Sequence, residues 1–171
     1  MTGPLGISFA SRAGHPPAEL GALAAAAERA GFAAVLLAEG SSDVLALCPA
    51  VLAATERVRV GTAIANAHLH PPHLTAMTAA TLADLAGGRF VLGLGVANPA
   101  LNHDQLGLPR VPPLALMEEY VALVRALHTG GTHAGELFRL AAPLQLDRPG
   151  QAPPIHLAAM RPRMLELAGR I

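Results

Sequence analysis

The chain has 171 residues, and its twelve arginines balance twelve acidic residues. This balance argues against nucleic acid as the partner, and the absence of lysine excludes Schiff-base chemistry within the chain. There is no uncharged apolar run of about 18 residues, and no basic segment leads into an apolar one near the start, so we expect a cytoplasmic protein without membrane contact. The single cysteine, Cys48, is expected to be a buried structural thiol.

Short apolar runs alternate with longer amphipathic segments in the first half of the chain. The runs that predict strands are residues 4–10, 33–39, 58–65 and 90–96. The segments that predict helices run from Pro16 to Arg29, from about Asp43 to Thr55 and from Pro71 to Gly87. Within the second of these segments, Pro49 either kinks the helix or marks its true start.

The second half of the chain continues the pattern after a long loop. A helix is predicted from near Pro113 to Gly130, because its apolar residues recur on one face. Residues 132–152 are expected to hold a small strand pair. A fifth strand at residues 155–159 and a helix from near Pro162 complete the chain.

Five strand–helix units with apolar, non-alternating strands predict an α/β fold with a parallel sheet covered by helices. Each unit takes about 34 residues, so the eight units of a TIM (β/α)8-type barrel would need roughly 270. We therefore expect one domain over residues 1–171, a partial barrel of about five βα units that is incomplete at its C-terminal end.

Glycines alternate along the fourth predicted strand, in the sequence GGRFVLGLGVANPALN at residues 87–102. A dinucleotide-binding fingerprint needs its glycines in a turn that opens directly into a helix. Gly93 and Gly95 instead lie inside the strand, and Pro99 interrupts the segment after it, so that motif is excluded. The missing side chains either let a flat ligand approach the backbone or only relieve crowding inside a barrel.

Four segments resemble the bacterial luciferase-like superfamily of barrel oxidoreductases, which use flavin or the deazaflavin coenzyme F420. The segments are AELGALAAAAERAGFAAVLLAE, LAATERVRVGTAIAN, TAATLADLAGGRFVLGLGVANPALN and PPIHLAAMRPRMLELAG. The resemblance implies coenzyme F420 or FMN as cofactor, with hydride transfer to or monooxygenation of a small organic substrate. It covers nearly the whole chain but only the first half to two-thirds of a family domain.

The resemblance also implies that the cofactor lies against the ends of the third, fourth and fifth strands. The implied cofactor-binding residues are Ala63, Ile64, Gly95, Val96, Asn102, Ala159 and Met160. In many F420-using members a cis peptide without proline backs the ring, and here that bond would be Ala63–Ile64. Asn102 either hydrogen-bonds the cofactor or is a turn residue that satisfies its own backbone.

Glu39 and His68 are the candidate catalytic residues. Family members often have an acid followed by a histidine after the second strand, but here Gly40 follows Glu39, which puts sugar-phosphate dehydrogenase activity in doubt. His68, His70 and His73 form an H-x-H-x-x-H pattern, and clustered imidazoles can bind zinc. Metal-dependent hydrolases carry H-x-H on the first strand, often with a lysine downstream. We therefore expect no metal, and contact of one histidine with substrate or cofactor.

Two other functions stay open at this point. One is a non-catalytic partial barrel that another chain completes, and the other is a metal-dependent hydrolase. A partial barrel leaves two sheet edges unpaired and its inner face open, where we expect Ile7, Val35, Leu37, Leu92 or their alternates. We therefore expect a homo-oligomer or a poorly soluble chain with little activity of its own.

Overall fold

The computed structural model of the chain describes residues 4–10, 14–144, 146 and 152–171. The strands of its main sheet are β1 (Gly6–Ala10), β2 (Ala34–Ala38), β3 (Arg59–Thr62), β4 (Ala65–Asn66), β5 (Phe90–Gly95) and β8 (Ile155–Leu157). The α-helices are α1 (Pro17–Arg29), α2 (Val44–Ala53), α3 (Pro72–Leu85), α4 (Pro113–Thr129) and α5 (Pro162–Arg170). Each helix and strand expected from the sequence is present, with ends shifted by a few residues.

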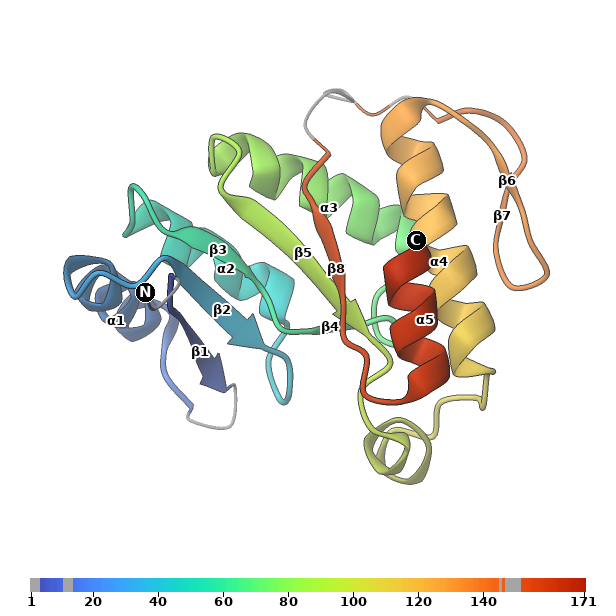
Figure 1. Cartoon of the computed structure of the whole chain (residues 1–171), viewed down its shortest axis with the longest axis horizontal. Coiled ribbons are helices and arrows are strands. Elements are labelled where there is room, and N and C mark those ends of the chain that lie inside the picture. The colour runs from blue at the N-terminus through green and yellow to red at the C-terminus, as the bar shows by residue number, and fades with distance from the viewer. Residues whose placement is uncertain (1–3, 11–13, 145, 147–151) are drawn as a thin grey trace.

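All pairs in the main sheet are parallel. The order is β1-β2-β3-β5, with β4 continuing along the β3 edge of β5 and β8 pairing with the other edge (Figure 1). Helices α1, α2 and α3 pack on β2, β3 and β5. The separate strands β6 (His133–Ala134) and β7 (Arg139–Leu140) form the predicted antiparallel pair. The expected α/β fold with a helix-covered parallel sheet is therefore confirmed.

Local sequence explains where the helices begin. Four helices have proline in the first turn, where its missing N–H is not needed: Pro17, Pro72, Pro113 and Pro162. Helix α2 begins differently, because the Asp43 side chain accepts hydrogen bonds from the backbone N–H groups of Leu45 and Ala46. Pro49 therefore lies inside α2 and does not mark its start.

The third predicted strand is interrupted. It divides into β3 and β4 at Ala63–Ile64, whose peptide bond is cis, as the family resemblance implies. Val60 pairs with Phe90 and Ala65 with Leu94, so the third strand contains one more residue than β5 over this stretch. The interruption is therefore a bulge that changes the direction in which the subsequent side chains point.

Gly93 lies where the third strand comes closest to β5. A Cβ atom at Gly93 would overlap the backbone oxygen of Thr62. The Thr62 hydroxyl donates a hydrogen bond to the Gly93 carbonyl oxygen at 2.6 Å and accepts one from the Gly93 N–H at 2.9 Å. Packing within the sheet thus requires glycine here, and the crowding interpretation holds for Gly93.

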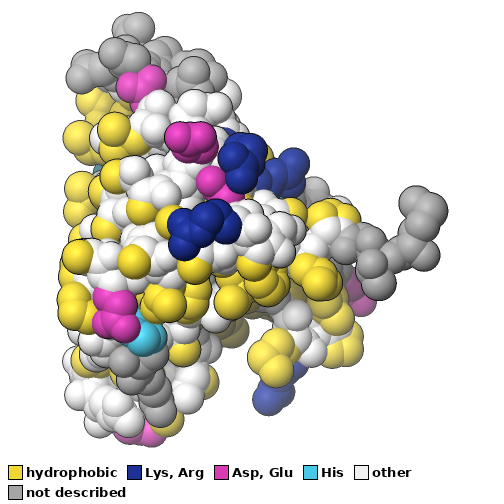
Figure 2. Space-filling view, turned by 90° about the vertical axis from the view of Figure 1, so that its left-hand side faces the viewer, with side chains coloured by type: hydrophobic (Ala, Val, Ile, Leu, Met, Phe, Trp, Pro, Cys, Tyr) yellow, Lys and Arg dark blue, Asp and Glu magenta, His cyan; other side chains and the backbone are white. Residues whose placement is uncertain are grey.

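The two faces of the sheet carry different side chains. Four apolar residues belong to, or pack against, the core that the sheet shares with the helices: Ile7, Val35, Leu37 and Leu92. The alternates form the other face, where Ser8 is exposed and Leu36 is half-buried. Of the two sets of residues that the expectation left open for the inner face, the structure therefore favours the alternates. In Figure 2, hydrophobic side chains border a hollow at the lower right of the molecule.

The long loop after β5 contains a π-helix, Ala100–Gln105, which the sequence did not predict. The Asn98 side chain, one residue before the N-cap Pro99, accepts hydrogen bonds from the first two backbone N–H groups of this helix, those of Ala100 and Leu101. Asn102 is the buried residue of the π-helix, at 1 % exposure. The loop is thereby folded back onto the strand ends.

The expectation that Cys48 is buried is confirmed. Cys48 is fully buried, its thiol donates to the Val44 carbonyl oxygen, and burial raises its pKa to about 12, as expected of a structural thiol. Within the described part of the chain, no helix combines the length and apolar character that crossing a membrane requires.

Candidate active site

Polar side chains gather where β2, β4 and β5 end. Glu39 follows β2 directly, and its backbone N–H donates to the carbonyl oxygen of Ile64 at 3.3 Å. Its carboxylate Oε2 accepts a hydrogen bond from the backbone N–H of Asn66 at 2.5 Å. The carboxyl ends of parallel strands form the functional face of a barrel, so Glu39 is fixed at that face.

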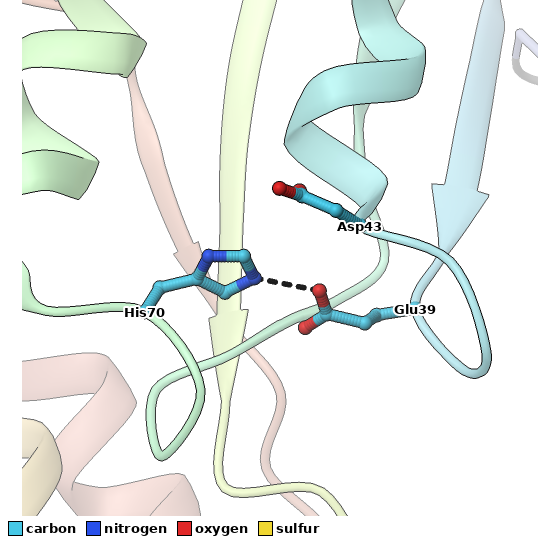
Figure 3. Close-up of side chains that lie close together, drawn as sticks. All are labelled: Glu39, Asp43 and His70. Atoms are coloured by element: carbon cyan, nitrogen blue, oxygen red, sulfur yellow. Dashed lines mark hydrogen bonds and ion pairs between the residues drawn. The ribbon is translucent and has the colours of Figure 1, made fainter.

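The His70 ring, four residues after β4, reaches back to Glu39. Its Nε2 lies 2.6 Å from the Glu39 Oε1, and the two side chains point toward each other (Figure 3). Asp43, at the start of α2, also offers a carboxylate oxygen, and the three groups lie within 4.8 Å of one another. An imidazole beside two carboxylates is favoured in its protonated form.

The position and charge of His70 have separate causes. The hydroxyl of buried Tyr120 donates to the His70 carbonyl oxygen at 2.9 Å and accepts a hydrogen bond from the Thr75 hydroxyl at 2.6 Å. The hydrogen bond to Glu39 raises the pKa of His70, burial opposes the rise, and the charges of Glu39 and Asp43 add to it. The side chain retains 12 % exposure. His70 is therefore a fixed imidazole that favours its cationic form.

A second hydrogen-bonded group joins β4 to the loop after β5. The Asn66 side chain donates to the Asn102 side-chain oxygen at 2.7 Å, and the Asn102 amide donates to the Val96 carbonyl oxygen at 2.8 Å. Both asparagines are buried. Asn102 thus orders the ends of the third and fourth strands, and its direct contact with a cofactor stays a prediction.

His68 lies beside another histidine. Its ring meets that of His103 edge to face, with the centroids 5.8 Å apart. Burial, followed by the charge of His103, lowers the pKa of His68. His68 has no carboxylate partner among the interactions of the described residues, and its catalytic role stays a prediction.

The H-x-H-x-x-H pattern does not gather its imidazoles. Each histidine, cysteine, aspartate or glutamate offers an atom that could bind a metal. Among the described residues, only Glu39, Asp43 and His70 bring three of these atoms within 4.8 Å of one another. One Glu39 oxygen accepts the backbone N–H of Asn66, and the other lies against the His70 imidazole. An Asp43 oxygen caps α2. We therefore interpret the trio as an ion-paired, hydrogen-bonded group.

Gly95 forms the floor of a small apolar cradle at the end of β5. A Cβ atom at Gly95 would lie 3.0 Å from the Ile64 Cγ1 and 3.2 Å from the Ala158 Cβ. A single side chain would therefore fill the cradle. Flavin and deazaflavin ring systems are flat, so a backbone surface bordered by short apolar side chains fits them.

The other implied cofactor-binding residues differ in how deeply they are buried and in whether they lie next to the cradle. Ala63 and Val96 are half-buried and directly adjoin the cradle residues in sequence. Ala159 packs against the core, whereas Met160 is 95 % exposed. Ala158, which was not among the implied cofactor-binding residues, is the residue of this strand end that borders the cradle.

Two polar residues of the site, Asn66 and His70, were not among the candidate catalytic or cofactor-binding residues. Asn66 carries the same signal that selected Glu39, a polar residue at the end of an apolar strand. The pairing of His70 with Glu39 left no such signal, since it depends on how the chain turns after β4. Nothing in the local pattern distinguishes His70 from His68.

A parallel sheet covered by helices, with polar side chains gathered where its strands end, is the architecture of a (β/α) barrel, a fold that binds ligands at this face. The chain belongs to the luciferase-like monooxygenase family, whose pattern it matches over residues 4–171.

Individual relatives are named as F420-dependent enzymes. Over 140 residues the chain is 38 % identical to a protein of Mycobacterium tuberculosis named as a coenzyme F420-dependent oxidoreductase, covering 80 % of this chain and 40 % of that one. It is 35 % identical over 171 residues to the F420-dependent glucose-6-phosphate dehydrogenase of Nakamurella multipartita, covering 91 % and 50 %. The chain thus spans about half the length of these relatives or less.

A solved structure shares the fold. The coenzyme F420-dependent tetrahydromethanopterin reductase of Methanopyrus kandleri matches with a TM-score of 0.87 and 24 % identity, over 98 % of this chain and 53 % of that one. The likeness supports the partial-barrel description of the architecture.

Proposed function

We propose that this chain provides the cofactor-binding part of an oxidoreductase that moves a hydride between coenzyme F420 and a small organic substrate. The cradle at Gly95, beside the ion-paired Glu39, is the observation that carries the proposal. Both curated relatives are named for F420, which favours F420 over FMN. When bound, the cofactor supplies the hydride chemistry, and the protein supplies binding and orientation.

Individual residues have distinct proposed roles in holding the ring. Ile64, Gly95 and Val96 form its floor, and Ala63 supports that floor from the third strand. Asn102 holds the Val96 carbonyl oxygen in place through its 2.8 Å hydrogen bond. Ala159 and Met160 lie in the segment after β8 and are proposed to border the rest of the cofactor.

The substrate is proposed to be other than a sugar phosphate. One relative is named as a glucose-6-phosphate dehydrogenase, but in this chain Gly40 follows Glu39, where the family often places a histidine. Family membership also favours an oxidoreductase over the hydrolase and the non-catalytic alternatives.

Titration of the purified chain with F420, and separately with FMN, tests the proposal by fluorescence. We expect binding in the micromolar range or tighter, abolished by Gly95→Val because the added side chain occupies the cradle. Circular dichroism should show that this variant remains folded. Gly169→Ala is the matched control, since its Cβ meets no described atom within 4 Å, and it should bind like the wild type. Binding of neither cofactor would overturn the proposal.

We further propose a cytoplasmic homo-oligomer without a metal centre. Among the described residues, β1 and β8 each pair along one edge only, which supports association of copies. Sedimentation should show an oligomer, and a compact monomer would contradict it. Metal analysis should find less than one zinc per chain, whereas stoichiometric zinc lost from a His68→Ala, His70→Ala double variant would favour a hydrolase.

A further inference from the structure

The proposed function leaves the paired His70 and Glu39 without a chemical role. We propose that His70 is the proton donor of a reduction catalysed at this site, positioned by Glu39. The substrate class is then an aldehyde, ketone or imine, whose oxygen or nitrogen must gain a proton when its carbon gains a hydride. This inference rests on the proposed function, because the cradle must hold the hydride donor.

The end of the third strand connects the cradle to the imidazole. The Ile64 side chain borders Gly95, and the Ile64 carbonyl oxygen accepts the backbone N–H of Glu39. The Glu39 carboxylate in turn meets Nε2 of His70 at 2.6 Å. The cradle at Gly95 is therefore linked through Ile64 to Glu39, and through Glu39 to His70, at the carboxyl ends of the strands.

The fold uses only one ring nitrogen of His70. Nε2 faces Glu39, and none of the hydrogen bonds found among the described residues involves Nδ1. The side chain remains 12 % exposed, and Nδ1 is neither hydrogen-bonded to a described residue nor fully buried, so it is the nitrogen left for a substrate. A carboxylate that orients an imidazole through one nitrogen, so that the other exchanges a proton, is an established catalytic arrangement.

The surrounding charges favour a donor over a base. Glu39 at the end of β2 and Asp43 at the start of α2 both stabilise the imidazolium. Tyr120 on α4 contributes no charge, because burial raises its pKa and its hydroxyl bonds the His70 backbone oxygen. His68 has the opposite tendency, since burial lowers its pKa. Of these two histidines, His70 is the one that holds a proton to give.

The step balances in atoms and electrons. The substrate carbon accepts a hydride from the reduced deazaflavin or flavin, and the electrons of its C=O or C=N π bond move to the heteroatom. The imidazolium gives its Nδ1 proton to that atom. A C–H bond and an O–H or N–H bond form, the cofactor is left oxidised, and the neutral imidazole regains a proton from water.

His70→Gln separates proton donation from positioning. The glutamine amide nitrogen can replace Nε2 as donor to Glu39, but it does not titrate. In the oxidoreductase of which this chain is the cofactor-binding part, assayed with reduced F420 and a set of aldehydes, ketones and imines, we expect the rate to fall about 100-fold or more, with F420 affinity unchanged. The wild-type rate should fall as pH rises through the pKa of His70. This falling limb of the pH–rate profile should be absent in the variant.

His73→Gln, a change within the same histidine pattern, should keep both the rate and the limb. Nuclear magnetic resonance of ¹⁵N-histidine protein gives a second readout, with the pKa of His70 above 6.5 in the wild type and lower in Glu39→Gln. A wild-type rate in His70→Gln, a His70 pKa at or below 6.5, or no reduction of any tested compound would each overturn the inference. Failure of the proposed function is seen separately, as loss of F420 and FMN binding.

Discussion

Two regions of the molecule each bring a glutamate and a histidine together, with different results. At the strand ends, Nε2 of His70 lies 2.6 Å from the Glu39 carboxylate. In the hairpin region, formed by α4, β6 and β7, Nε2 of His133 lies 3.7 Å from the Glu119 carboxylate and forms no hydrogen bond with any described residue. The same two residue types thus form a bonded pair in one region and only neighbours in the other.

The difference lies in what else each carboxylate binds. Glu119 accepts hydrogen bonds from the consecutive backbone N–H groups of residues 136–138, and these outweigh burial and lower its pKa. Glu39 accepts one backbone N–H, from Asn66, and keeps an oxygen for His70. The carboxylate in the hairpin region is thus occupied by backbone N–H groups, whereas the one at the strand ends binds an imidazole as well as a backbone N–H.

A third histidine extends the comparison. His128, in the last turn of α4, is 5 % exposed, and neither ring nitrogen has a hydrogen-bond partner among the described residues. Burial alone lowers its pKa, in the opposite direction to His70. For these two histidines, the hydrogen bond to a carboxylate that His70 makes and His128 lacks accounts for the opposite directions of their pKa shifts.

Gly93→Ala should have the largest effect, because backbone contact holds the strand ends together. The added Cβ would overlap the Thr62 carbonyl oxygen, which no side-chain rotation relieves, so we expect a loss of about 3 kcal/mol or more in the free energy of unfolding. Gly95→Ala is the control, since its Cβ meets the flexible Ile64 side chain at 3.0 Å. Urea denaturation measures both, and equal losses would contradict the assigned role of Gly93.

Glu119→Ala should destabilise the hairpin region alone. It removes the acceptor of three N–H groups, one of them on half-buried Phe138, and we expect a loss of about 1 kcal/mol, or roughly 2–4 °C in Tm. Glu136→Ala, a change to an exposed glutamate of the same hairpin, should leave Tm unchanged. The pKa of His70 should not move, and a shift in it would show that the two regions are coupled.

His70→Gln should change how stability depends on pH. Since the pKa of His70 is raised on folding, its stabilising contribution is full below the unfolded value of 6.5 and is lost as pH rises through the folded pKa. The variant should therefore lose more stability near pH 6 than near pH 9. Urea denaturation at both pH values measures this, and an equal loss at both would show that the charge of His70 contributes nothing.

His128→Leu should have the smallest effect and the opposite sign. Because the pKa of His128 is lowered on folding, the wild type loses stability as pH falls below 6.5, when the unfolded chain binds the proton more readily. Leucine removes this loss, so Tm should rise by about 1–2 °C in mild acid and change less at neutral pH. An unchanged acid dependence would mean that His128 has a partner after all.

The sequence alone determined the elements and their order, for local reasons. Prolines at the starts of α1, α3, α4 and α5 place those helices, and apolar runs without alternation indicate a parallel sheet. Glu39 was recognisable because a charged residue directly after an apolar strand lies at the functional face of a barrel. The interruption at Ala63–Ile64 was not visible in periodicity, and only the family resemblance indicated it.

Only the tertiary structure decided which of several equivalent residues are used. Gly93 and Gly95 look alike in sequence, yet Gly93 accommodates the Thr62 backbone and Gly95 leaves the cradle open. His70 meets Glu39 across 31 residues of chain, a pairing that depends on the bulge after β3 and on Tyr120 of α4. Local sequence specifies backbone conformation, whereas contacts between distant side chains depend on how the elements pack, and that packing made His70 the partner of Glu39.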